Sequence, residues 1–183
     1  VPVKITWSIP HPEMTGRMLD AVAAEWGLTL REAAERLLPA GAIMFQMQEA
    51  DVQRILAHPR SMIGSDGLPH DDFPHPRLWG TFPRVLGHYA RDLGLFSLET
   101  AVHKMTGRTA EVFGLPDRGV IRPGAYADLV LFDPATIRDA ADFEQPTRPA
   151  EGIIETWVNG RSTWVGGRGA TTARAGRLVT RQA

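Results

Sequence analysis

Apolar residues recur at helical spacing through the first third of the chain. Residues 17–26 carry an apolar side chain every three or four positions, which predicts a helix with one buried face. A second helix is predicted to begin at Thr29, because Thr29 and Glu32 match a capping box in which each side chain satisfies an unpaired backbone N–H. Residues 3–7 read as a short strand and residues 49–57 as a third helix.

The middle of the chain combines a short apolar stretch with further helices. Residues 61–64 read as a buried strand that runs into a loop rich in Pro, His and Asp. Helices are predicted over residues 82–93 and 98–105, with Ser97 as N-cap of the second and a shorter helix before Gly114.

The pattern changes after residue 115. Residues 127–132 are apolar and β-prone, and Asn159-Gly160 at the centre of residues 153–165 is a strong signal for a hairpin. From about residue 166 the chain is rich in Gly, Ala and Arg, so we expect a flexible tail. The periodicity therefore predicts an α/β part followed by a small β part.

Composition narrows the classes of function. The 183 residues are 43% hydrophobic and 22% charged, which is ordinary for a globular protein. A net charge of -1 does not favour nucleic-acid binding, and no apolar run is long enough to cross a membrane. The absence of cysteine excludes disulfides and thiolate metal ligands within the chain. We expect a cytoplasmic location, although the start at Val1 reads as a strand entered in mid-fold.

Asp66 is the sharpest single candidate for a catalytic residue. It follows the predicted strand at residues 61–64 and precedes Gly67. In βα architectures, side chains at the carboxyl ends of strands line the active site. Ser65-Asp66-Gly67 is more typical of a turn in which the aspartate bonds the local backbone, and both interpretations stay open.

Two other groups of residues are weaker candidates. His70, Asp71, Asp72 and His75 cluster in one loop, but zinc takes three or more well-placed ligands and this spacing is equally typical of a solvated turn-rich loop. No two of the six histidines lie at i and i+2 or on one helical face.

Met44, Phe45 and Met47 form an apolar patch around Gln46. Methionine adapts its shape to varied ligands, so this patch could line a binding pocket. It is also typical of ordinary core packing, which the residues alone favour.

Longer strings carry more information than single residues. Residues 62–71 read Met-Ile-Gly-Ser-Asp-Gly-Leu-Pro-His-Asp, residues 75–84 read His-Pro-Arg-Leu-Trp-Gly-Thr-Phe-Pro-Arg, and residues 123–130 read Pro-Gly-Ala-Tyr-Ala-Asp-Leu-Val. These strings resemble the D-aminoacylase family of the amidohydrolase superfamily. Further matching strings are residues 5–8, 11–13, 39–43, 104–107, 113–115 and 158–160.

The resemblance implies a metal-bearing (β/α)8 barrel with a small β-sandwich built from both ends of the chain. Residues 1–115 would be the C-terminal portion of the barrel, including a lid insertion at about residues 9–58. Residues 116–166 would supply the C-terminal share of the β-sandwich, and residues 167–183 the flexible tail.

The resemblance also implies a chemistry. Asp66 matches the strand-end aspartate expected at the zinc site, where zinc lowers the pKa of its bound water and a carboxylate takes and returns the proton. Met44 and Met47 resemble lid positions that line the substrate pocket, and Ser65 and Gly67 are assigned with them to substrate binding. The substrates would be N-acyl-D-amino acids.

The remaining ligands expected for the family have no counterpart in this chain, and a whole barrel needs about 250 residues. We therefore expect those ligands to lie in a missing N-terminal part of the same protein. The isolated chain is expected to bind zinc weakly, to lack deacylase activity and to self-associate through exposed sheet edges.

Two alternatives remain. One is a related cyclic-amide hydrolase of the dihydroorotase or hydantoinase type, which shares the closing Ala-Asp-Leu-Val pattern. The other is a non-catalytic module that packs against a partner.

Overall fold

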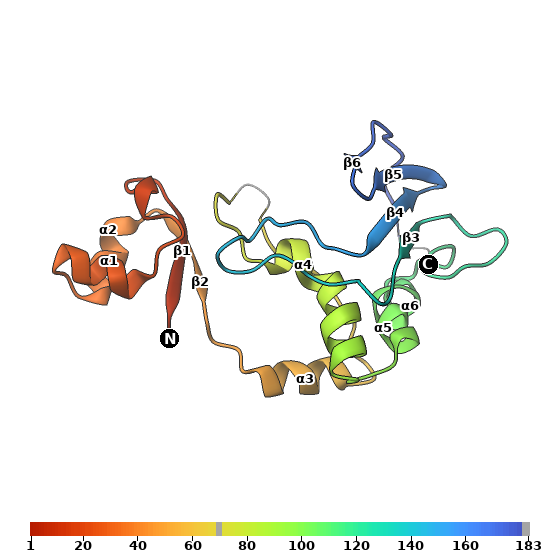
Figure 1. Cartoon of the computed structure of the whole chain (residues 1–183), viewed down its shortest axis with the longest axis horizontal. Helices are drawn as coiled ribbons and strands as arrows, with labels where there is room; N and C mark the ends of the chain where they lie inside the picture. Colours follow the sequence, from red (N-terminus) through yellow and green to blue (C-terminus); the bar gives the residue numbers. More distant parts are fainter. Residues whose placement is uncertain (69–70, 181–183) are drawn as a thin grey trace. The chain divides into compact units, whose positions relative to one another are not determined.

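The computed structural model describes residues 1–68 and 71–180 and contains both helices and strands (Figure 1). The elements of the first half are β1 (Val3–Ser8), the 3-10 turn η1 (Pro12–Met14), α1 (Leu19–Trp26), α2 (Leu30–Leu37), β2 (Ala40–Met44) and α3 (Glu49–Ala57). Those of the second half are α4 (Arg77–Arg84), the π-helix η2 (Val85–Asp92), α5 (Leu98–Met105), α6 (Gly107–Phe113), β3 (Leu129–Phe132), β4 (Ile153–Val158), β5 (Arg161–Val165) and β6 (Gly169–Ala170).

These elements form two compact units, each assembled from segments that lie far apart in the sequence. Unit 1 contains Val1–Val52, Ser65–Trp79 and Ala141–Arg148. Unit 2 contains Gln53–Gly64, Gly80–Ala140 and the described residues from Pro149 onward. The mixture of helices and strands agrees with the predicted α/β class, and the domain boundary near residue 115 stays a prediction.

Unit 1 is built on a two-stranded antiparallel sheet of β1 and β2. Helices α1 and α2 pack together and bring their apolar faces onto this sheet. The core consists of Ile5, Met14, Val22 and Leu37. The predicted capping box of α2 is confirmed: the Glu32 amide donates to Thr29 Oγ1, and the Glu32 carboxylate accepts from the Thr29 amide.

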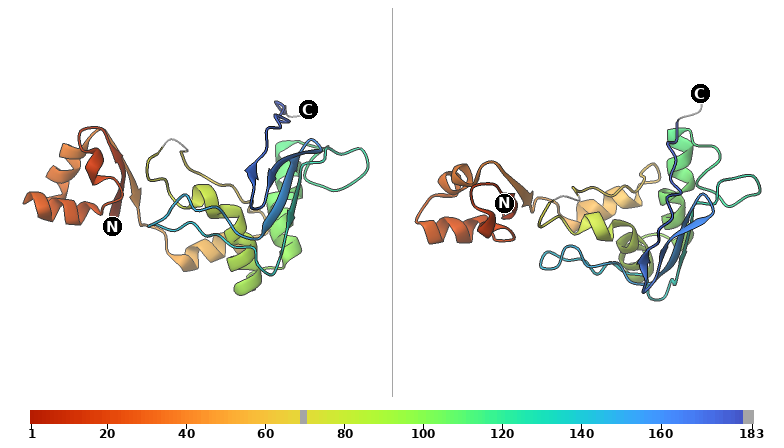
Figure 2. Two further views of the ribbon diagram at one scale, coloured as in Figure 1. Left: turned by 45° about the horizontal axis from the view of Figure 1, so that its top comes forward. Right: turned by 90° about the horizontal axis from the view of Figure 1, so that it is seen from above.

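The helices predicted in the second half of the chain are present, but the first of them differs from its prediction in where it begins and in its type. The helix predicted over residues 82–93 begins earlier, at Arg77, and continues from Val85 as a π-helix. Ser97 caps α5 by accepting a hydrogen bond from the Thr100 amide, as predicted. In both views of Figure 2, α5 and α6 lie beside the strands of the second sheet.

That second sheet has four antiparallel strands in the order β3-β4-β5-β6. The hairpin between β4 and β5 turns at Asn159 and Gly160, whose φ angles of 50° and 76° are those of a type I′ turn, so this prediction is confirmed. Strand β6 pairs with β5 and lies within the segment predicted as a tail, whose flexibility stays a prediction.

Ile137 of unit 2 has no exposed surface. Two glycines allow the backbone to approach it. A Cβ added at Gly87 would lie 2.4 Å from the Ile137 carbonyl oxygen, and one added at Gly152 would lie 2.5 Å from the Ile137 Cα. Only a residue without a side chain fits at either position.

The strand predicted over residues 61–64 is wrong, because these residues form no regular element. The Ile63 amide donates instead to the carbonyl of Lys104 near the end of α5, and the Ser61 amide donates to the His58 carbonyl. Apolar residues alone do not make a strand, since its backbone needs a partner strand. Among the described helices, none has the length and apolar character needed to cross a membrane.

Candidate functional site

Asp66 lies at the surface of unit 1, with 74% of its side chain exposed. Its carboxylate forms an ion pair with Arg77, whose Nη2 lies 2.5 Å from Asp66 Oδ2. Arg77 Nε also donates to the Asp66 carbonyl oxygen at 3.1 Å. One guanidinium therefore contacts both the backbone and the side chain of Asp66, which limits the directions that the carboxylate can adopt.

The start of α4 places Arg77 opposite Asp66. The Arg77 amide donates to His75 Nδ1 at 3.0 Å, and the Leu78 amide donates to the His75 carbonyl at 3.0 Å, so His75 satisfies amides of the first helical turn. Gly67 allows the loop that contains Asp66 to lie close to α4. A Cβ at Gly67 would lie 2.8 Å from the Leu78 Cβ, so the loop can pass α4 at this distance only with glycine.

His75 is uncharged at neutral pH in this setting. Burial, and to a smaller extent the positive charge of Arg77, lower its pKa to about 4 against the opposing effect of the negative charge of Asp66. A neutral imidazole can keep accepting the Arg77 amide through Nδ1. The positive charge beside Asp66 is therefore that of Arg77 and not that of His75.

The predicted substrate-binding residues are also on unit 1. Ser65 and Gly67 flank Asp66 directly, and Ser65 is exposed. Met44 ends β2 and Met47 follows it, with 61% and 69% of their surfaces exposed. The core-packing alternative for these two methionines is therefore wrong, and their role in binding substrate stays a prediction.

The described residues do not by themselves form a metal centre. No group of three His, Asp or Glu side chains within residues 1–68 and 71–180 could hold a metal ion. Of the loop cluster considered above, His70 lies outside the described residues. Zinc requires three or more protein ligands, and Asp66 would supply one. The residues that the structure describes therefore do not form a zinc site on their own.

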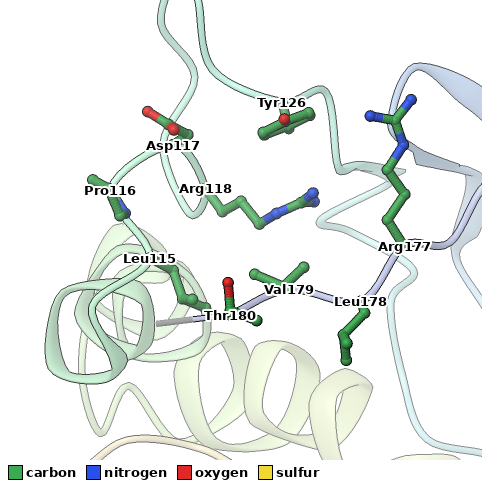
Figure 3. Close-up of a pocket in the computed structure, with 9 residues that line it drawn as sticks. All are labelled: Leu115, Pro116, Asp117, Arg118, Tyr126, Arg177, Leu178, Val179 and Thr180. Atoms are coloured by element: carbon green, nitrogen blue, oxygen red, sulfur yellow. The ribbon is translucent and has the colours of Figure 1, made fainter. Parts of the chain in front are cut away.

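The cavity drawn in Figure 3 lies in unit 2 and contains none of these residues. It has a volume of about 160 Å³, and Arg118 lies under the ring of Tyr126 with its Cζ 4.3 Å from the ring centroid. Arg118 is also bound to Asp128 and to Asn159 Oδ1. These contacts tie the turn of the β4–β5 hairpin to the segment before β3, which indicates a structural role.

Arg77 is the site residue that the sequence analysis missed. It lies eleven positions after Asp66, inside the string of residues 75–84 that was used only for the resemblance. The available signal was a basic residue eleven positions after a candidate catalytic carboxylate. Because α4 begins at residue 77, Arg77 lies close enough to form its ion pair with Asp66.

The profile of the amidohydrolase family matches residues 19–164. The chain belongs to the amidohydrolase family. A D-aminoacylase from Alcaligenes xylosoxydans xylosoxydans is 61% identical over 179 residues, which are 98% of this chain and 37% of that protein. The predicted resemblance to D-aminoacylases is thereby confirmed for this member of the amidohydrolase family.

Two solved structures are similar to this amidohydrolase chain. A D-aminoacylase with a binuclear metal centre matches with a TM-score of 0.95 and 59% identity, over 99% of this chain and 38% of that one. An N-acyl-D-glutamate deacylase from Bordetella bronchiseptica, in complex with zinc and a phosphonate inhibitor, matches with a TM-score of 0.92 and 50% identity, over 96% of this chain and 37% of that one. The chain thus spans a little more than a third of the length of these relatives.

Proposed function

We propose that this chain is the C-terminal part of a zinc-dependent hydrolase that cleaves N-acyl-D-amino acids to a carboxylate and a D-amino acid. The observation that carries the proposal is the similarity to D-aminoacylase, which extends over 98% of the chain and includes the loop that bears Asp66. On this proposal, residues 1–115 complete a (β/α)8 barrel, with residues 9–58 as its lid, and residues 116–166 contribute to a small β-sandwich.

Asp66 acts as the general base and then the general acid. Its carboxylate accepts a proton from the water whose oxygen bonds to the N-acyl carbon. As the bond from this carbon to nitrogen breaks, Asp66 returns the proton to the departing amine. Arg77 supports this role because its two contacts with Asp66 fix where the carboxylate points. The 74% exposure of the Asp66 side chain leaves it accessible to a substrate.

The remaining parts of the site follow from the same proposal. Met44 and Met47 present exposed thioether side chains that suit the apolar side chain of a substrate, and Ser65 and Gly67 contact the substrate beside Asp66. Zinc is the proposed cofactor. Asp66 is one ligand, and the others come from parts of the complete protein outside this chain.

Kinetics of the complete protein with N-acetyl-D-methionine test the assignment. Asp66→Asn keeps the size of the side chain and removes the base, so we expect kcat to fall by about 10³-fold. Asp72→Asn is the matched control, because Asp72 is an exposed aspartate of the same loop, and it should retain more than half of the activity. Equal activity of the Asp66→Asn variant and the wild type would rule out the assigned role.

Three further measurements separate the proposal from its alternatives. The purified 183-residue chain should show no deacylase turnover. The complete protein should prefer the D- over the L-enantiomer of its substrate. Hydrolysis of dihydroorotate or a hydantoin in place of a linear amide would favour the cyclic-amide alternative, and no hydrolysis of either class would favour a non-catalytic module.

A further inference from the structure

Segment Ala141–Arg148 belongs to unit 1, although its neighbours on both sides in the sequence belong to unit 2. A local turn shapes this segment. Asp142 Oδ1 accepts hydrogen bonds from the amides of Glu144 at 2.8 Å and Gln145 at 2.6 Å, as aspartate does in turns. The turn places Phe143 at its tip.

Lys4 of β1 holds the tip in place. Its Nζ donates to the Phe143 carbonyl and to Glu144 Oε1 at 3.0 Å, across 139 and 140 positions of sequence. The ammonium also lies 4.9 Å from the centroid of the Phe73 ring. Only 4% of Lys4 is exposed, and a desolvated ammonium keeps its charge only with good partners. The geometry of the Phe143 backbone is therefore closely specified.

The ring of Phe143 touches two segments that carry candidate site residues. Its centroid lies 4.7 Å from that of Phe45 and 5.2 Å from that of the His75 ring. Both pairs are inclined, as favourable aromatic pairs are. Phe45 lies between Met44 and Met47 in the sequence, so one ring contacts both the proposed lid segment and the loop that contains Asp66.

The contact between Phe143 and His75 is linked to the candidate base Asp66 through two further interactions. His75 Nδ1 accepts the Arg77 amide, and the Arg77 guanidinium bonds Asp66 through both its carboxylate and its carbonyl. A change in the position of the His75 ring is therefore passed to the start of α4 and to the guanidinium that orients Asp66.

We infer that Phe143 is a positioning residue of the deacylase site: its ring, held by Lys4, keeps the Met44–Met47 segment and the Asp66–Arg77 pair in fixed positions relative to the same substrate. This inference rests on the proposed function, since it assigns the two segments to one site. It predicts that Phe143 acts on substrate binding and on chemistry without touching the substrate.

Substitutions of Phe143 in the complete enzyme test this role by two independent readouts. The first is the titration midpoint of His75, followed by NMR in protein with 13C-labelled histidine and assigned with His75→Gln. We expect about 4 in the wild type and a rise of at least one pH unit in Phe143→Ala, because a ring packed against His75 is removed and its burial is reduced. The second readout is kcat and KM for N-acetyl-D-methionine. Here we expect a higher KM and a roughly tenfold loss of kcat/KM.

Two further variants make the comparison specific. Phe143→Leu keeps most of the buried volume and should show both effects at reduced size. Phe113→Ala removes an equal ring from the exposed end of α6 in unit 2, and should change neither readout. If Phe143→Ala shows no cooperative thermal transition, Phe143→Leu and Lys4→Met carry the test, with the same two shifts expected.

The outcomes separate clearly. An unchanged His75 midpoint together with an unchanged kcat/KM in Phe143→Ala overturns the inference. A shifted midpoint with unchanged kinetics also overturns it, because Phe143 would then only pack. A lower kcat with constant KM and constant midpoint reports a smaller folded fraction and counts against it as well. Absence of deacylase turnover in the wild type instead contradicts the proposed function, which the NMR readout does not depend on.

Discussion

Each of the two units buries one lysine, and the partners of the two ammonium groups differ. Lys4 of unit 1 bonds to a carbonyl and a carboxylate from a segment about 140 positions away. Among the described residues, Lys104 of unit 2 bonds to neutral groups: the His58 carbonyl at 2.6 Å, Ser61 Oγ at 3.0 Å and the Ser61 carbonyl at 3.4 Å. Both residues are 4% exposed.

The two units also differ in how their buried residues are packed. Unit 2 buries Ile137, which two backbone segments approach closely at Gly87 and Gly152. Unit 1 has a small apolar core. It also contains the hydrogen bonds from Lys4 Nζ to the Phe143 carbonyl and to Glu144 Oε1, which we call the Lys4 clasp. Close packing tolerates little change in volume. The unit that carries the candidate base holds its distant segment through a buried polar contact at Lys4.

The largest effect should come from the packing of unit 2. A methyl group in Gly87→Ala would meet the Ile137 carbonyl at 2.4 Å, so we expect a loss of about 3 kcal/mol of stability. Gly64→Ala is the matched control, since an added Cβ there meets nothing within 4 Å, and it should change stability by less than about 0.5 kcal/mol. Hydrogen exchange of amides in each unit measures both. Equal protection in the two variants would contradict the importance of this close approach.

Removal of the clasp should have the next largest effect. Lys4→Met keeps the apolar stem but removes a charge-assisted hydrogen bond and leaves the Phe143 carbonyl without this donor, so we expect a loss of about 2 kcal/mol. The loss should appear as faster amide exchange in β1 and in residues 141–148. If exchange increases only in unit 2, the clasp does not stabilise unit 1.

A pH titration sharpens the description of unit 1. His75 has a lowered pKa of about 4 in the folded state, against the ordinary value of 6.5. The unfolded chain therefore binds a proton that the folded protein does not, and stability falls as the pH drops from 6.5 to 4. Because the ring is partly exposed, we expect a loss of about 1.5 kcal/mol relative to His75→Gln over this range. Denaturant unfolding at several pH values measures it, and parallel curves would contradict the burial of His75.

The smallest effect should follow removal of the lysine of unit 2. Burial lowers the pKa of Lys104, and the charge of Arg108 adds to this. Lys104→Met loses hydrogen bonds to neutral acceptors, but it also removes a desolvated charge that forms no ion pair with a carboxylate of the described residues, so we expect a change below about 1 kcal/mol. Since the folded-state pKa is lowered, the wild type should gain stability relative to this variant as the pH rises toward 10.5. A loss larger than that of Lys4→Met would reverse the ranking of the two lysines.

Much of the local structure could be predicted from short patterns. Thr29 with Glu32, Ser97 before α5, and Asn159-Gly160 between two β-prone runs each specify a cap or a turn through bonds to the nearest backbone. Such signals are reliable because all the interacting groups lie within a few residues. The strand predicted at residues 61–64 failed because a strand requires a distant partner, which periodicity does not identify.

The residues of the candidate site likewise fall into those that the sequence could predict and those that it could not. Asp66 could be proposed from its place after an apolar run and from the resemblance, and the family comparison agrees with that resemblance. Its partner Arg77 could not, since the pair depends on where α4 begins and on the close passage of Gly67 beside Leu78. Nor did any pattern connect Phe143 with His75, because aromatic contacts between segments leave no periodic trace.

By itself, the sequence determined the caps, the hairpin, the helical faces and the family, because each depends on neighbouring residues or on strings long enough to be specific. Only the tertiary structure decided that residues 141–148 join unit 1, that Lys4 is buried against them, and that one guanidinium holds Asp66. The physical reason is that these contacts gain their free energy from groups brought together by the packing of whole segments. No residue in such a contact reveals its partner until the chain is folded.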